Sequence, residues 1–281
     1  MINAPFPLVA IDADRRLHAC LEGPLGAPVV VFDHGAFGMY ADGWWLKEAL
    51  KADHQVLLYG RAGMGFSDPA PRDAVLSPAW HVADMRGLLV ALELPPPWLL
   101  VGHSMAGLRL HAFANLHPDE LAGLVFVDAL HPHAYRQTVA ARHLHAFTLA
   151  LRAGELAAGL GLVGLVAGAL RDDLGLPTER AREKRHVFDA RTHWSHSRRE
   201  MTGFNANDPL FDRQAAADLP VAVFASRADG GENAGLVRAA AARGQFNELQ
   251  AWPDQSHTSV LDPEHAARIA ATIRTMTGLK A

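Results

Sequence analysis

The feature that most constrains the fold of this chain is a series of short, continuous apolar runs separated by segments of helix length. Such runs occupy residues 28–33, 54–65, 97–104, 122–130 and 219–229. Apolar runs without polar alternation are typical of strands that are buried on both faces of a parallel sheet. Because these runs alternate with helical patterns, they predict an α/β fold with a mostly parallel, doubly wound sheet.

The segments between the runs support this interpretation. Helical patterns cover residues 42–53, 77–94, 105–117 and 233–243, and a last strand-like run at 247–252 precedes a helix that begins near Pro263. Near the N-terminus, the apolar runs 8–11 and 17–22 flank a short polar turn. That arrangement predicts an antiparallel hairpin at the edge of the sheet.

The alternation is interrupted once, between residues 131 and 217. No convincing strand occurs there, and Ala, Leu, Arg and His recur with helical spacing. A helical insertion between two core strands is best placed over the carboxyl edge of the sheet, where open α/β sheets bind ligands. We therefore expect core segments at 1–130 and 218–281 and a helical cap insertion at 131–217.

A serine stands where the third apolar run turns into a helix. The stretch is Gly102-His103-Ser104-Met105-Ala106-Gly107. Gly-x-Ser-x-Gly between a strand and a helix forms a tight, strained elbow that exposes the serine hydroxyl above the sheet. Ala106 replaces the last glycine of that pattern, a change of one methyl group, and Gly107 follows it. The stretch predicts that Ser104 is a nucleophile.

A serine hydroxyl needs a base, and the base needs an orienting acid. In strand–elbow–helix sites the acid and then the histidine follow the serine along the chain. His257 lies in a polar loop after the last strand-like run, and Asp229 lies in the loop after the strand expected at 219–226. We expect Asp229 to be the acid, with Asp128, at the end of the preceding strand, as the alternative.

Acyl transfer also requires two N–H donors for the developing oxyanion. One should be the N–H of Met105, which follows the nucleophile. The other should come from the loop after the first buried strand, where Ala36 is the preferred residue and Phe37 the second choice. The glycines on either side, Gly35 and Gly38, allow that backbone to turn its amides toward a ligand.

These motifs together resemble the α/β-hydrolase fold superfamily, specifically its capped, cofactor-independent serine hydrolases. The similarity is carried by His34-Gly35, by the stretches 59–67 and 102–107, and by "LVFVDALHP" at 124–132. It extends over nearly all of the chain except the cap. Two positions depart from the family pattern: Ala106 replaces a glycine, and Gly60 replaces the usual aspartate before Arg61. The second departure could change how Arg61 is anchored beneath the site.

Composition excludes several other classes of function. A formal charge of −4 argues against a nucleic-acid surface, which needs clustered basic residues. The single cysteine, Cys20, allows neither an internal disulfide nor a cysteine-based zinc site. The sixteen histidines include pairs such as His193 with His196, but no carboxylate completes a metal-ligand spacing, so we expect no metal. The glycines near residue 63 do not have dinucleotide-binding spacing, and no cofactor is expected.

Two further observations concern localisation. The first seven residues lack the basic and apolar regions of a secretory signal. The least polar segment, residues 156–170, is shorter than the ~20 residues that span a bilayer. The sequence therefore predicts a cytoplasmic protein without stable membrane insertion.

We expect a serine hydrolase that cleaves a carboxylic ester, or a related thioester or lactone, through an acyl-enzyme. The Ala- and Leu-rich cap favours a small-molecule substrate with a hydrophobic group. An aspartate at the elbow would have indicated dehalogenase or epoxide hydrolase chemistry, whereas this chain has Ser104. The alternatives are a C–C bond hydrolase or perhydrolase with the same triad, and a non-catalytic ligand receptor. Candidate pocket residues are Trp44, Trp45, Phe147 and Leu151.

Overall fold

The computed structural model describes residues 4–136, 138–163, 174–205, 207–213 and 215–279. Its centre is an eight-stranded sheet with the strand order β1-β2-β4-β3-β5-β6-β7-β8. The strands are β1 (Leu8–Ala10), β2 (Arg16–Glu22), β3 (Val29–Asp33), β4 (Gln55–Tyr59), β5 (Trp98–His103), β6 (Leu121–Val127), β7 (Val221–Ala225) and β8 (Asn247–Ala251).

Strand directions confirm the predicted architecture. All neighbouring pairs from β4 through β8 are parallel. β1 and β2 form the predicted antiparallel hairpin at the edge, and β2 pairs antiparallel with β4. Consequently the carboxyl ends of β3, β5, β6, β7 and β8 lie along the same edge of the sheet, and the loops that follow them can form one site.

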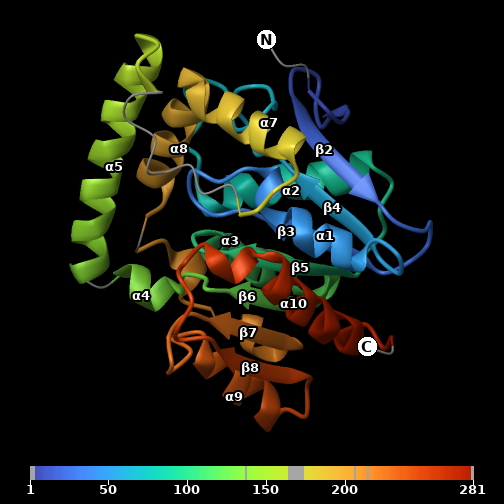
Figure 1. Cartoon of the computed structure of the whole chain (residues 1–281). Coiled ribbons are helices and arrows are strands. Elements are labelled where there is room, and N and C mark those ends of the chain that lie inside the picture. Colours follow the sequence, from blue (N-terminus) through green and yellow to red (C-terminus); the bar gives the residue numbers. More distant parts are fainter. Residues whose placement is uncertain (1–3, 137, 164–173, 206, 214, 280–281) are drawn as a thin grey trace.

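Helices cover both faces of the sheet (Figure 1). On one face α1 (Trp44–Leu50) packs against α10 (Pro263–Met276), and on the other α2 (Pro78–Ala91) packs against α3 (Ala106–Leu116). The remaining core helix is α9 (Ala234–Ala242), which packs on β7 and β8. This is the doubly wound arrangement that the alternation of apolar runs and helices predicted.

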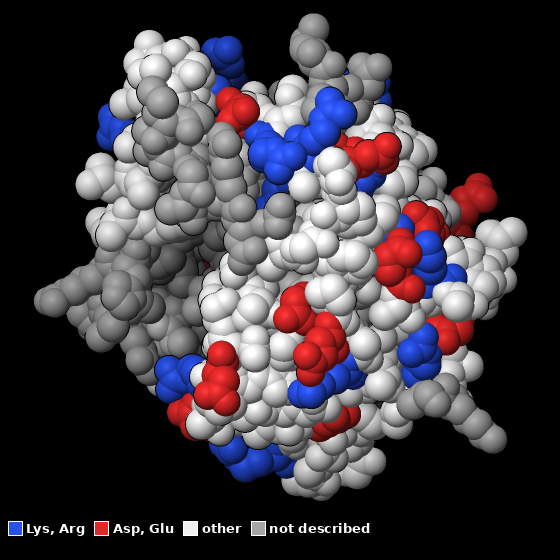
Figure 2. Space-filling model, viewed as in Figure 1, with Lys and Arg blue, Asp and Glu red and all other residues white. Residues whose placement is uncertain are grey.

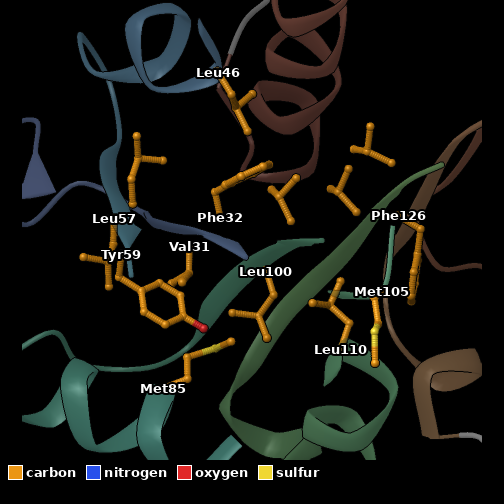
Figure 3. Packing of buried hydrophobic residues seen from close by; sticks show 14 of the residues in the cluster. Val31, Phe32, Leu46, Leu57, Tyr59, Met85, Leu100, Met105, Leu110 and Phe126 are labelled. Atoms are coloured by element: carbon orange, nitrogen blue, oxygen red, sulfur yellow. The ribbon is translucent and has the colours of Figure 1, made fainter. Parts of the chain in front are cut away.

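The core is continuous through the sheet because successive strand residues point to opposite faces. In Figure 3, Phe32 lies with Leu46 of α1 on one face, whereas Tyr59 lies toward Met85 of α2 on the other. All four side chains are buried. Each burial of this kind stabilises the fold by about 1.5–3 kcal/mol relative to an exposed side chain. The sheet is thereby a rigid base for the loops at its carboxyl edge.

A helical insertion separates β6 from β7, as the sequence predicted. It contains α4 (Pro132–Arg136), α5 (Thr138–Gly159), α7 (Thr178–Asp189) and α8 (Arg191–Gly203). Figure 1 shows α5, α7 and α8 grouped together, away from α9 and β8. The limits of 131 and 217 for a separate cap remain a prediction. Residues 164–170 of the apolar segment lie outside the described residues; within the described part, no helix is both long and apolar enough to cross a membrane.

The face of the molecule seen in Figure 2 carries acidic and basic side chains side by side rather than in separate fields. Charged side chains across the described residues form ion pairs, such as Lys51 with Glu48 and Arg86 with Glu120. Exposed pairs of this kind contribute little to stability, about 0–1 kcal/mol each. The charged groups relevant to the site are therefore the buried ones described below.

Candidate active site

The turn between β5 and α3 is the predicted elbow. Ser104 has a φ of +57°, a left-handed conformation that is strained for a residue other than glycine. The backbone around it is held on both sides, because the Ser104 N–H donates to Val127 O at 3.2 Å and the Leu130 N–H donates to Ser104 O at 2.8 Å. These bonds connect the elbow to the last residue of β6 and to the loop that follows it, and they fix where the hydroxyl emerges.

The small residues of the elbow are needed at positions 102 and 107. A Cβ on Gly107 would lie 2.2 Å from the carbonyl oxygen of Leu130, and one on Gly102 would lie 2.8 Å from the side chain of Leu110. Ala106 is fully buried, and its methyl group is accommodated because Gly102 has no side chain. The alanine at position 106 is thus tolerated. The helix backbone comes closest to the loop after β6 one residue later, at Gly107.

Ser104, His257 and Asp128 form a hydrogen-bonded chain. His257 Nε2 lies 2.8 Å from Ser104 Oγ, and His257 Nδ1 lies 2.5 Å from Asp128 Oδ2. Three separate loops supply these residues, after β5, β6 and β8. His257 is also located by His103, which donates from Nε2 to the His257 carbonyl at 2.8 Å. The order nucleophile, base and acid is that of a serine-hydrolase triad.

The expected acid, Asp229, is not part of this chain, and the structure corrects that prediction in favour of Asp128. Asp229 is 66% exposed and pairs with Arg227. Its Oδ1 also accepts the Gly231 N–H at 3.0 Å, so the residue closes the glycine-rich turn after β7. The glycines that follow it, Gly230 and Gly231, are typical of a turn-forming aspartate.

Hydrogen bonds from neighbouring residues hold the Asp128 side chain in place and keep it ionised. Ser226, the first residue after β7, donates both its N–H and its hydroxyl to Asp128 Oδ1, at 2.9 and 2.8 Å. Burial alone raises the pKa of Asp128, but the hydrogen bonds from His257 and Ser226 outweigh it and lower the pKa to about 2. Asp128 is therefore a carboxylate at neutral pH, as the orienting acid of a triad must be.

The candidate oxyanion donors lie beside Ser104. Met105 immediately precedes α3, whose N-terminus favours negative charge. The loop after β3 passes so close that a Cβ on Gly35 would lie 3.4 Å from Ser104 Oγ. Among the described residues, the N–H groups of Met105, Ala36 and Phe37 donate no hydrogen bond to the protein. These amides are thus available to a ligand, as oxyanion donors must be.

A cavity of about 510 Å³ opens onto Ser104 and His257. Most of its lining is apolar and comes from both the core loops and the helical insertion: Phe37, Met105, Leu130, Tyr135, Phe147, Leu174, Phe188, Met201 and Leu261. The expected pocket residue Phe147 is among them. The same volume is typical of sites for small organic ligands.

The other three expected pocket residues lie elsewhere. Trp44 packs under the charged groups of Lys47 and Arg180, and Trp45 donates from its indole to the carbonyl of Leu174. Leu151 is buried within the helical insertion without lining the cavity. A large apolar side chain in the sequence does not by itself distinguish packing from ligand contact, and here packing accounts for all three.

Sequence reasoning missed one charged feature of the cavity wall. Lys184 of α7 forms an ion pair of 2.9 Å with Asp42, and both line the cavity. Asp42 Oδ2 also accepts the Met39 N–H at 3.0 Å. The pair joins the helical insertion to the core, and a run of charged residues in a helix gave no sign that one lysine faces inward.

A second set of charged groups lies fully buried beneath the loop after β3. It consists of Asp33, Arg61, Arg109 and Glu200. Arg61, the residue after the unusual Gly60, donates to Asp33 at 2.8 Å and to Glu200 of α8 at 2.6 and 2.9 Å. Gly60 itself leaves no room for an aspartate, since a Cβ there would lie 2.8 Å from Met64 O. Glu200 provides a carboxylate for Arg61 from the helical insertion.

The two histidines singled out as a possible metal pair have structural partners. His193 Nε2 donates to the Phe37 carbonyl at 3.1 Å, and His196 Nε2 accepts the Ala70 N–H at 3.1 Å. Over the described ranges, no group of three or more His, Cys, Asp or Glu side chains is arranged to hold a metal ion.

Comparison with curated proteins finds partial similarity only. The chain is 34% identical over 138 residues to the sn-1-specific diacylglycerol lipase ABHD11 of Mus musculus. The matched segment covers 48% of this chain and 42% of that protein. It is 28% identical over 126 residues to a probable transporter, efuK, of Hormonema carpetanum, covering 43% of this chain and 18% of the other. The chain thus spans less than half the length of either relative.

Solved structures resemble the chain over nearly its whole length but at low sequence identity. A putative epoxide hydrolase from Pseudomonas aeruginosa superimposes with a TM-score of 0.74 at 17% identity, covering 98% of this chain and 97% of that one. The enol-lactonase of Burkholderia xenovorans gives 0.62 at 18% identity, with 96% and 99% covered. A thermophilic esterase from Thermogutta terrifontis gives 0.63 at 18%, with 95% and 96% covered. These likenesses establish the fold.

The family model described as "alpha/beta hydrolase fold" matches residues 28–231, which is more than half of the chain. The matched range includes the loop after β3, the elbow and Asp128, and the strand order and the helical insertion agree with it. The chain belongs to the α/β-hydrolase fold family.

Proposed function

We propose that this protein is a serine hydrolase that cleaves a carboxylic ester, or a related thioester or lactone, through an acyl-enzyme. The observation that carries the proposal is the hydrogen-bonded chain Ser104–His257–Asp128, with distances of 2.8 and 2.5 Å, at the mouth of a largely apolar cavity. The residue at the elbow is Ser104 and not an aspartate, which supports a serine nucleophile and argues against dehalogenase or epoxide hydrolase chemistry.

In the first half-reaction Ser104 Oγ attacks the ester carbonyl carbon while His257 Nε2 takes the hydroxyl proton. The carbonyl oxygen becomes an oxyanion, which the N–H groups of Met105 and Ala36 stabilise. The Asp128 carboxylate stabilises the imidazolium. When the intermediate collapses, the bond to the leaving oxygen breaks, His257 donates its proton to that oxygen, and an ester between Ser104 and the acyl group remains.

In the second half-reaction water replaces the alcohol. His257 takes a proton from water as the oxygen attacks the acyl carbon, and the bond to Ser104 Oγ breaks as His257 returns the proton to it. The products are the carboxylic acid and the regenerated enzyme, with no cofactor consumed. The His257 side chain is 53% exposed, which gives water a route to the base.

The cavity favours a hydrophobic substrate group. Its aromatic and aliphatic lining includes Phe147 and Phe188 from the helical insertion and Leu261 from the core. Each buried methylene of a substrate chain is worth about 0.8 kcal/mol. We therefore expect kcat/KM for p-nitrophenyl esters to rise with acyl chain length until the cavity is filled. A preference for charged or very polar acids would contradict this part of the proposal.

The first experiment measures hydrolysis of p-nitrophenyl acetate and butyrate by wild type and by Ser104→Ala. Fluorophosphonate labelling, with the modified residue mapped by mass spectrometry, accompanies it. We expect the label on Ser104 and a loss of kcat of about 10⁴-fold or more in the variant. An inert wild type whose Ser104 resists the label would overturn the proposal and favour a ligand receptor. Turnover confined to C–C or peroxide substrates would favour the alternative hydrolase chemistries.

A further inference from the structure

The loop that supplies the second oxyanion donor is held from below by arginines. Arg61 donates to the carbonyl oxygens of His34 and Gly35, at 2.7 and 3.0 Å. Arg109 of α3 donates to the same His34 carbonyl at 2.6 Å. In a planar trans peptide the C=O and the N–H point in opposite directions. Fixing Gly35 C=O on Arg61 therefore turns the N–H of Ala36 away from Arg61, on the side where Ala36 lines the cavity.

Arg61 in turn is held by one carboxylate from the core and one from the helical insertion. Asp33, at the end of β3, accepts from Arg61 and also pairs with Arg109 at 2.5 Å. Glu200 of α8 accepts two hydrogen bonds from Arg61, a bidentate geometry that fixes the guanidinium plane as well as its charge. The two arginines and two carboxylates balance in charge, and all four are buried.

The same helix contacts the loop a second time. His193 of α8 donates to the Phe37 carbonyl, and the Phe37 ring packs against Phe188, His193 and Trp194 with centroids 4.2–4.8 Å away. Burial lowers the pKa of His193 to about 4, so this donor is a neutral imidazole at neutral pH. Phe37 has a φ of +58°, a conformation that persists only where the surroundings impose it. The surroundings of Phe37 include His193 and Trp194 of α8 and Phe188 of α7.

We infer that Glu200 is a positioning residue for the oxyanion hole: through Arg61 it makes the geometry of the 34–38 loop depend on the docking of the helical insertion. The residue before Arg61 supplies no carboxylate from the core, because Gly60 has no side chain and a Cβ there would lie 2.8 Å from Met64 O. The expected effect on kcat rests on the proposed function. The contact from Glu200 through Arg61 to the 34–38 loop does not depend on any reaction.

The test compares Glu200→Gln with a matched control, Glu155→Gln. Glu155 also bonds an arginine of α8, Arg198, at 2.9 Å, but that pair joins α5 to α8 and does not reach the loop. The substrate is p-nitrophenyl butyrate. The probes are an alkyl trifluoromethyl ketone, which forms a tetrahedral alkoxide on Ser104, and the corresponding trifluoromethyl alcohol, which fills the cavity without reacting.

For Glu200→Gln we expect kcat to fall about 30-fold with KM changed less than about threefold, because a displaced donor weakens the transition state and not the ground state. The ketone should bind about 30-fold more weakly and the alcohol as in wild type. Amide hydrogen exchange of peptides covering residues 33–39 should accelerate about tenfold. Glu155→Gln should match wild type in every measurement.

A folded Glu200→Gln with wild-type kcat, ketone affinity and exchange would overturn the inference. So would an equal loss of ketone and alcohol binding, which indicates a deformed cavity. If Glu200→Gln does not fold, Glu200→Asp keeps the charge but shortens the side chain. In that variant we expect the ketone to bind more weakly than to wild type and the alcohol to bind equally well, with a smaller loss than in Glu200→Gln. An inert wild type would refute the proposed function alone, since hydrogen exchange still tests whether α8 holds the loop.

Discussion

The loops after β6 and β7 each present an aspartate at the carboxyl edge of the sheet, yet the two carboxylates have different roles. Asp128 follows its strand directly, is mostly buried and holds His257. Asp229 lies four residues beyond its strand, is exposed and closes a turn with Gly231. The β7 loop still contributes to the site, because its first residue, Ser226, donates two hydrogen bonds to Asp128. Both residues are aspartates, so residue type does not separate them. The carboxylate that directly follows its strand is the one that reaches the histidine.

The sharpest test of this comparison is to neutralise each aspartate separately. For Asp128→Asn we expect kcat for p-nitrophenyl butyrate to fall by about 10³–10⁴-fold, because the amide stabilises the wrong tautomer of His257 and cannot stabilise the imidazolium. For Asp229→Asn we expect kcat and KM within about twofold of wild type. Steady-state kinetics of the two variants measures both effects. A large loss in Asp229→Asn with little change in Asp128→Asn would reverse the assignment.

A second prediction concerns the neighbouring residues Ser226 and Arg227. Ser226→Ala removes one of the two hydrogen bonds that Asp128 receives from the β7 loop, and a hydrogen bond to a charged group is worth about 1.5 kcal/mol or more. We expect kcat/KM to fall about tenfold. Arg227→Ala breaks only the exposed pair with Asp229 and should leave kcat/KM within about twofold. Equal effects of the two substitutions would show that the loop acts on Asp128 as a whole and not through Ser226.

The smallest expected effect is on stability at low pH. The pKa of Asp128 is lowered from 3.8 to about 2, so its stabilising contribution is complete above about pH 4 and is lost as the pH falls through 2. Discounted for solvent at the half-exposed His257, it amounts to about 1 kcal/mol. Urea unfolding should therefore show the stability gap between wild type and Asp128→Asn shrinking by most of that amount between pH 6 and pH 2.5. Asp229→Asn should run parallel to wild type, because solvent screens its exposed pair.

Much of the core side of the site could be predicted from the sequence. Unbroken apolar runs identified the parallel strands, and the elbow around Ser104 and the late histidine, His257, follow from short motifs in that context. These features depend on local backbone requirements, which a sequence records directly. The choice between Asp128 and Asp229 was wrong because it depends on how two neighbouring loops pack. A usable signal was present: Asp128 follows its strand immediately, whereas the glycines after Asp229 indicate a turn.

The insertion side was predictable only as a set of helices. Phe147 was correctly expected at the cavity, but Trp44 and Trp45 were not distinguishable from it by residue type. The inward positions of Lys184 and Glu200 depend on which face of α7 or α8 meets the core, and charged residues on all sides of those helices conceal that face. The missing aspartate at Gly60 was the one indication that Arg61 needs a partner, although the sequence could not say which carboxylate it is.

The pairing of Arg61 with Glu200 has a consequence for protein engineering and for evolution by recombination. Exchanging the helical insertion for that of a relative, in order to change substrate preference, would leave Arg61 and Arg109 with a single buried carboxylate between them. A buried charge without a partner costs several kcal/mol. A graft therefore has to bring an acidic residue to the place of Glu200, or else restore one beside Arg61 at a position that tolerates a side chain. The insertion and the core are separate in sequence but are not interchangeable parts.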